Sequence, residues 1–144
     1  MIHTNNPDWA AIFRALEKWR KTILASTLAE DTAVTEIAAE HGQAKPWAVL
    51  VSTILSLRTK DDVTRTASRR LLERAPGPAE LLALGTKETA RLAYPAGFYR
   101  TKAANLAKIA AILLERHNGM VPADMDALLE LPGVGRKTAN LVLT

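Results

Sequence analysis

Apolar residues recur at helical spacing along this 144-residue chain, and this pattern constrains its fold more than any other feature. Trp47, Leu50, Val51, Ile54 and Leu55 follow one another at i, i+3, i+4, i+7 and i+8, which is the spacing of a helix with a broad core-facing stripe. We find no stretch that alternates apolar and polar residues in the manner of a half-buried strand. The sequence therefore predicts an all-α fold, a multi-helix domain.

Proline and glycine divide this pattern into short and medium helices. Pro46 is expected to open the helix just described, and Pro76-Gly77-Pro78 to end the following one. Asp61 is expected to be the N-cap of that second helix, and Thr101 the cap of a long helix that ends at Asn118-Gly119. The connections are short, so we expect the helices to pack closely without a linker.

Composition and charge limit the classes of function. Hydrophobic residues make up 48% of the chain and charged residues 24%, as in a soluble globular protein. The formal net charge of +4 favours polyanionic partners only weakly. The absence of cysteine excludes disulfides and thiolate metal or iron–sulfur ligation by these residues. We see no secretory signal and no apolar run long enough to span a membrane, so a cytoplasmic location and no membrane partner are expected.

A glycine-rich turn near the end of the chain is the strongest functional motif. The string Leu-Pro-Gly-Val-Gly-Arg-Lys-Thr-Ala at 131–139 stands between two apolar helical patterns, at about 123–144. Glycine lets backbone N–H groups approach a phosphate, and the N-terminus of the following helix adds partial positive charge. A plain helix–helix connector is the alternative. The residues expected to bind DNA here are Leu131, Gly133, Val134, Gly135, Arg136 and Thr138.

Lys137 directly follows this turn and is the candidate nucleophile. An amine must lose its proton before it can attack carbon. The first turn of a helix and the adjacent Arg136 both disfavour the charged ammonium. A solvated surface lysine, or one that only contacts phosphate, is the alternative.

Three blocks of this sequence together resemble the endonuclease III family of DNA glycosylase/AP lyases. Residues 131–143 resemble its helix-hairpin-helix. Val-Ser-Thr-Ile-Leu-Ser-Leu-Arg-Thr-Lys-Asp at 51–61 resembles its early helix and the loop that enters the minor groove. Gly-Phe-Tyr-Arg-Thr-Lys-Ala at 97–103 resembles its Gly-aromatic-x-x-Lys-Ala turn. The blocks keep the family's order and spacing, and the resemblance covers about residues 33 to 144.

The resemblance implies base excision repair of oxidised pyrimidines in double-stranded DNA. The damaged nucleotide is flipped out of the stack, a lysine forms a Schiff base with the sugar, and β-elimination breaks the strand. By position this catalytic lysine is Lys137. Arg58 stands where some relatives carry a glutamine that fills the gap left by the flipped base, although an ordinary loop arginine on phosphate or water is equally compatible. Lys60 and Lys102 are expected to contact the DNA backbone.

Two family features do not occur in this chain. The family has an aspartate after the hairpin, which supports deprotonation of the lysine, and then four cysteines that hold a [4Fe–4S] cluster. We therefore expect a fragment that is inactive or impaired alone, without a cofactor or metal of its own. Residues 1–40 would hold N-terminal helices that pack on the missing part, and residues 41–144 the six-helix-type glycosylase domain.

The N-terminal helix has an expected range of 7–24. Its apolar face would be left without its family partner, which suggests self-association through Ile12, Leu16, Trp19 and Ile23. Two other functions stay open for the chain. One is a non-catalytic helix-hairpin-helix DNA-binding module, and the other is a helical scaffold or dimerisation domain without a nucleic-acid partner.

Overall fold

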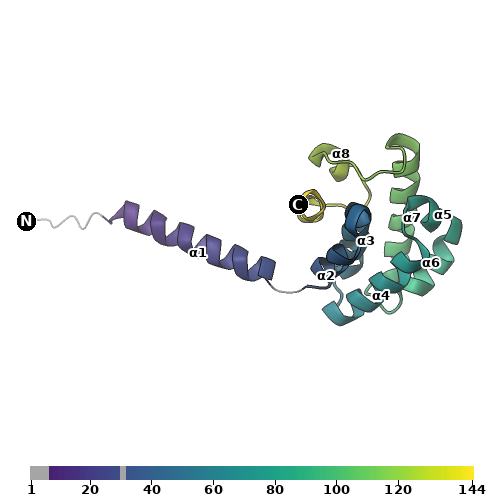
Figure 1. Cartoon of the computed structure of the whole chain (residues 1–144), viewed down its shortest axis with the longest axis horizontal. Coiled ribbons are helices and arrows are strands. Elements are labelled where there is room, and N and C mark those ends of the chain that lie inside the picture. The colour runs from purple at the N-terminus through teal and green to yellow at the C-terminus, as the bar shows by residue number, and fades with distance from the viewer. Residues whose placement is uncertain (1–6, 30–31) are drawn as a thin grey trace, which may run out of the picture. The chain divides into compact units, whose positions relative to one another are not determined.

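The structure, a computed structural model, consists of helices and the segments that connect them in the part of the chain that it describes. It covers residues 7–29 and 32–144, without the side chains of 22–29, and contains no strand in these ranges. The all-α prediction is confirmed. The chain divides into two units between residues 31 and 32 (Figure 1). None of the helices in the described ranges has the length and apolar character that a membrane crossing requires.

The first unit contains one helix, α1 (Trp9–Ala29), which is longer than the expected 7–24. Asp8 accepts a hydrogen bond from the amide of Ala11 at 3.1 Å and so caps its first turn. Every side chain of α1 up to residue 21 is exposed, including the large apolar ones, Trp9, Ile12, Phe13, Leu16 and Trp19. Ile23, the remaining member of the expected apolar face, lies outside the described side chains.

The second unit contains all the other helices. In chain order they are α2 (Ala33–Glu40), the short 3₁₀ helix η1 (Gly42–Ala44), α3 (Lys45–Ser56), α4 (Asp61–Arg74), α5 (Pro78–Leu84), α6 (Thr86–Ala93), α7 (Tyr99–Arg116), α8 (Met125–Leu129) and α9 (Arg136–Leu143).

The boundary between the units differs from the expected one after residue 40. Helix α2 belongs with the second unit because it packs against α3 and α4. Three ion pairs between α2 and α4 hold it there. Glu36 pairs with Arg65 at 2.5 Å and with Arg69 at 3.6 Å, and Glu40 pairs with Arg69 at 2.5 Å.

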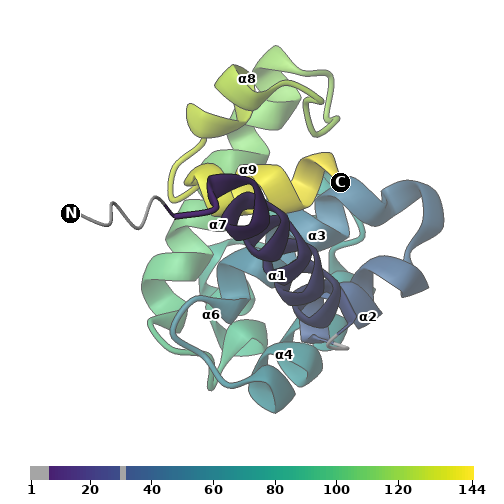
Figure 2. The same cartoon turned by 90° about the vertical axis from the view of Figure 1, so that its left-hand side faces the viewer.

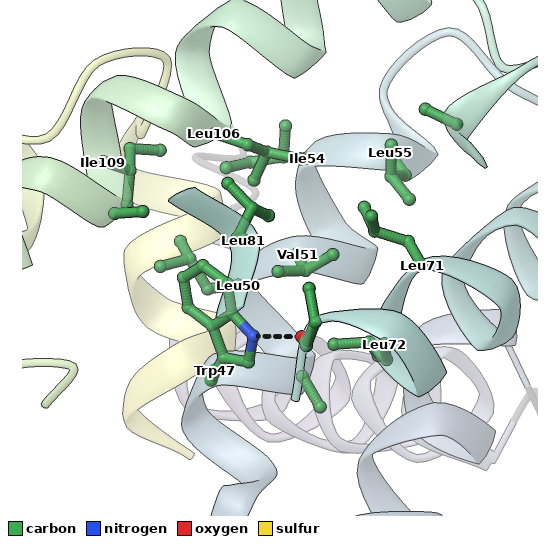
Figure 3. Close-up of a cluster of buried hydrophobic side chains, with 14 of the residues drawn as sticks. Trp47, Leu50, Val51, Ile54, Leu55, Leu71, Leu72, Leu81, Leu106 and Ile109 are labelled. Carbon is green, nitrogen blue, oxygen red and sulfur yellow. Dashed lines mark hydrogen bonds between the residues drawn. The ribbon is translucent and has the colours of Figure 1, made fainter. Parts of the chain in front are cut away.

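Helix α3 lies at the centre of the second unit. It packs against α2, α4, α7 and α9, and all its residues from Trp47 to Leu55 are buried. Polar side chains on a buried helix usually find a partner inside the protein. Ser52 donates to the carbonyl of Ala48 at 2.7 Å, whereas the buried hydroxyl of Thr53 has no hydrogen-bond partner within the described residues. The Trp47 indole donates to the carbonyl of Ala75 at 3.1 Å, the dashed line in Figure 3, and its predicted place in the core is confirmed.

Two helix starts differ from the expectations. Asp61 does not cap α4, because its carboxylate accepts instead from the amide of Ala33 at the start of α2, at 3.2 Å. Helix α7 begins at Tyr99, before the expected cap Thr101, and the N-cap position is Phe98 in a left-handed conformation with φ 54°. The first difference arises from a contact between segments 28 residues apart in sequence, which local patterns do not contain.

Candidate nucleic-acid interface

The glycine turn forms a hairpin between α8 and α9. Asp124 is the N-cap of α8, and its carboxylate accepts a hydrogen bond from the amide of Ala127 at 2.9 Å. The hairpin is anchored in the core by three buried side chains, those of Leu131, Val134 and Thr138. The side chains of these three residues, expected to bind DNA, are therefore not open to a ligand, and the amides of Leu131 and Val134 donate to the carbonyls of Leu128 and Leu131.

The two glycines of the hairpin have different reasons to be glycine. Gly133 has φ +76°, and a methyl group there would lie 3.1 Å from Nδ2 of Asn105 on α7. Gly135 has φ −96°, and a methyl group there would meet no atom within 4 Å. Both residues are exposed, and neither amide donates a hydrogen bond within the described part of the chain. The hairpin thus presents two open amides at a surface that can accept an anion.

Lys137 lies in the first turn of α9, directly after these amides. Its side chain is exposed, as is that of Arg136, whereas Thr138 and Ala139 are buried. Helix α9 packs against α3 (Figure 2). In residues 7–29 and 32–144, Lys137 forms no ion pair. The amine is therefore positioned by a helix that is anchored in the core, while its own end stays free to reach a ligand.

A second exposed element is formed by Arg58 and Phe98. Both are non-glycine residues in the left-handed region, with φ 55° and 54°. The guanidinium carbon of Arg58 lies 5.6 Å from the centroid of the Phe98 ring, and this ring is 63% exposed. Phe98 was not among the predicted site residues. Its signal in the sequence is the aromatic position of the turn at 97–103.

Lys102 and Lys60 have different environments. Lys60 is exposed and occupies the N-cap position of α4, which leaves its ammonium free for a phosphate. Lys102 is only 6% exposed, and burial lowers its pKa to about 8. Its Nζ donates to the carbonyls of Leu55 (2.9 Å) and Leu57 and to Oγ1 of Thr59 (3.1 Å). An ammonium has three donors, so none remains for the expected DNA contact.

The first half of α7 joins the two exposed elements. Lys102 contacts the loop that carries Arg58, and Asn105, three residues further along, lies against Gly133. Three residues span less than one helical turn. The hairpin and the Arg58–Phe98 pair are therefore attached to the same stretch of one helix, which places them side by side.

The residues present do not fit an iron–sulfur cluster. The chain has no cysteine, and in the described ranges no group of histidine and carboxylate side chains is arranged to hold a metal ion. No chemical step is assigned to such a group in this chain.

Comparison with known proteins agrees with this geometry. Residues 51–140 match the family model described as HhH-GPD superfamily base excision DNA repair protein. Endonuclease III of Thermotoga maritima is 45% identical over 103 residues, which cover 72% of this chain and 48% of the relative. The chain spans about half the length of the curated relatives that it matches.

Two solved structures share the fold at appreciable identity. A non-covalent endonuclease III–DNA complex matches with a TM-score of 0.65 and 39% identity, over 68% of this chain and 46% of that one. A trapped covalent intermediate of endonuclease III with DNA matches with a TM-score of 0.65 and 35% identity, over 77% and 55%. The arrangement of helices around the hairpin is thus found in structures with DNA bound.

Proposed function

Because the chain belongs to the HhH-GPD superfamily of base excision DNA repair proteins, we propose that it binds double-stranded DNA at a damaged base or abasic site. In this proposal Lys137 is the nucleophile that attacks C1′ of the damaged nucleotide, and oxidised pyrimidines are the lesions. The resemblance of the three sequence blocks to the endonuclease III family supports this choice of lesion and reaction.

The open amides of the hairpin are the observation that carries the proposal. Gly133 and Gly135 present N–H groups at an exposed surface, and the N-terminus of α9 adds its partial positive charge at the same place. A phosphate held there is bound through the backbone, without reading sequence. Lys137 then stands within the next turn, so the grip on the phosphate also places the amine near the adjoining sugar.

The chemistry requires Lys137 in its neutral form. At an abasic site the amine nitrogen forms a bond to C1′, the aldehyde oxygen leaves as water, and a Schiff base remains. Loss of a proton from C2′ then expels the 3′ phosphate and breaks the strand. At a damaged base the same attack on C1′ displaces the base as the leaving group.

We further propose that Arg58 and Phe98 support the DNA at the gap opened by the flipped nucleotide. A guanidinium plane and an exposed aromatic ring both stack on bases. Both residues are exposed, and the guanidinium carbon lies 5.6 Å from the ring centroid. In this proposal Arg58 fills the gap left by the flipped base, as the sequence suggested, and Phe98 fills it together with Arg58.

Borohydride trapping on DNA that already contains an abasic site tests the proposal. Such DNA needs no base removal, so the experiment isolates the formation of the Schiff base. Because the expected aspartate is not among these residues, we expect the wild-type chain to form the covalent adduct slowly, and Lys137→Gln to form none over the same prolonged incubation. Lys45→Gln is the matched control, because Lys45 is an exposed lysine at the first residue of α3, and it should give the adduct at the wild-type level.

A non-catalytic DNA-binding module is the second candidate function. The open hairpin amides alone would support it, because phosphate binding needs no nucleophile. Specific binding to abasic-site DNA with no adduct from the wild-type chain would establish this alternative and reject Lys137 as a nucleophile. Absence of any salt-dependent affinity would reject both candidates, since phosphate contacts impose a steep salt dependence.

A further inference from the structure

The end of α3 leaves carbonyl groups that another segment must satisfy. The last four carbonyls of a helix have no partner within it. The ammonium of Lys102 on α7 reaches two carbonyls at this end, those of Leu55 at 2.9 Å and of Leu57. A cation at a helix C-terminus also interacts favourably with the helix dipole. Lys102 thus closes α3 from another helix, at the point where the loop carrying Arg58 begins.

Thr59 connects this loop to the turn before α7. Its Oγ1 accepts from Lys102 at 3.1 Å and from the amide of Gly97 at 2.8 Å. Its own amide donates to the carbonyl of Ser56 at 3.1 Å. One hydroxyl therefore joins the Arg58 loop, the Gly97 turn and the buried ammonium in a single network.

Gly97 allows the two segments to touch through their backbones. A methyl group at this residue would lie 2.5 Å from the carbonyl oxygen of Arg58, closer than non-bonded atoms approach. The turn is also held from its other side, because the Arg70 guanidinium donates to the carbonyls of Leu92 (2.9 Å) and Tyr94. The turn thus has a support of its own, and Lys102 fixes the Arg58 loop onto it.

We propose that Lys102 is a positioning residue that holds Arg58 beside Phe98, so that their stacking surface is formed before DNA arrives. Lys102 itself does not touch the DNA. This inference rests on the proposed function of the Arg58–Phe98 pair, and it replaces the expected phosphate contact of Lys102.

Two opposing effects set what Lys102 contributes to stability. Burial disfavours its charge and lowers its pKa to about 8, a penalty that a methionine of similar shape would not have. A methionine would, however, leave the carbonyls of Leu55 and Leu57 without their donor, which destabilises the folded state. All three hydrogen bonds of the ammonium end at the C-terminus of α3 or in the Arg58 loop, so we expect their loss to be felt first in that loop.

The variant Lys102→Met removes the ammonium and keeps the apolar stem. Fluorescence anisotropy with a duplex that contains a tetrahydrofuran abasic analogue measures its affinity across a range of salt concentrations. We expect binding about tenfold weaker than wild type, the size of one lost stacking contact. The slope of log K against log salt should be unchanged, because no phosphate contact is lost.

Two further variants calibrate this experiment. Lys60→Met removes an exposed lysine next to the loop and should reduce the salt slope by about 0.9. Lys45→Met, at the far end of α3, should bind within about twofold of wild type, as surface changes usually have small effects. A Lys102→Met slope that falls like that of Lys60→Met would show direct phosphate contact and overturn the inference, as would wild-type affinity.

Amide hydrogen exchange by NMR tests the geometry without DNA. In Lys102→Met we expect the hydrogen-bonded amides of Gly97, Leu57 and Thr59 to lose protection, while core amides such as that of Leu106 keep theirs. Equal loss of protection everywhere would mean a global structural role and would overturn the inference. Unchanged protection at Gly97 would also overturn it. If wild type fails to bind DNA, the proposed function fails, and the exchange result still decides whether Lys102 orders the loop.

Discussion

Replacing Gly133 by alanine tests the geometry on which the hairpin depends. The residue has φ +76°, a conformation that costs a residue with a Cβ about 1–2 kcal/mol. The added methyl group would also stand 3.1 Å from Nδ2 of Asn105, which must move by a few tenths of an ångström. Against this strain, alanine restricts the unfolded chain and so contributes about 0.4–1 kcal/mol of stability.

Gly135→Ala is the matched control, because it carries the same effect on the unfolded chain. Its backbone, with φ −96° and ψ −178°, suits any residue, and its methyl group would meet nothing within 4 Å. The difference between the two variants therefore isolates the strain at Gly133. We expect Gly133→Ala to be less stable than Gly135→Ala by about 1–2 kcal/mol.

Urea denaturation followed by far-ultraviolet circular dichroism measures this difference. It should also appear as a lower melting temperature of Gly133→Ala, by roughly 4–8 °C for a unit of this size. DNA binding separates the variants in another way. The methyl group of Gly135→Ala points into the open space of the phosphate site, so affinity should fall without a loss of stability. Equal stability of the two variants would refute the conformational argument.

Three other perturbations have expected outcomes. Burial lowers the pKa of Lys102 from 10.5 to about 8, so between these pH values the folded state binds fewer protons than the unfolded chain. The free energy of unfolding of the wild type should therefore rise with pH relative to that of Lys102→Met, by at most about 3 kcal/mol. A difference between the two that stays constant in urea titrations would contradict this. Phe98→Ala should weaken binding to abasic-site DNA roughly tenfold with the same unfolding midpoint, and unchanged anisotropy would exclude the stacking role. We propose self-association through the exposed apolar face of α1. Light scattering should show a wild-type mass that rises with protein concentration, and the mass of a monomer for Leu16→Glu. A wild-type mass that does not depend on concentration would exclude self-association.

The helices were predictable because their signals are local. The stripe from Trp47 to Leu55 and the breaker at Pro76-Gly77-Pro78 define elements that the structure contains. The stripe did not reveal how completely α3 is buried, because Ser52 and Thr53 interrupt the apolar run and are nevertheless inside the core. Which surfaces a helix buries depends on its neighbours, and a periodic pattern does not specify them.

The candidate site was predictable only where a motif is continuous in the sequence. The hairpin and Lys137 stand in one short string, in which the two glycines and Lys137 are exposed, and their use in binding DNA stays a prediction. Lys102 was expected to contact the DNA backbone because it stands at the start of the long helix. Its true partners, the carbonyls of Leu55 and Leu57, lie 47 and 45 residues away in the chain. The pairing of Arg58 with Phe98 depends on the same long-range contacts.

The claim that the hairpin aims the amine of Lys137 at the sugar has one most direct test. The wild-type chain is incubated with abasic-site DNA, and the Schiff base is reduced with borohydride. The adduct is digested with protease and nuclease, and the peptide that carries the sugar remnant is sequenced by mass spectrometry. We expect the remnant on the side chain of Lys137. A remnant on Lys60, on another lysine or on the N-terminal amine would contradict it.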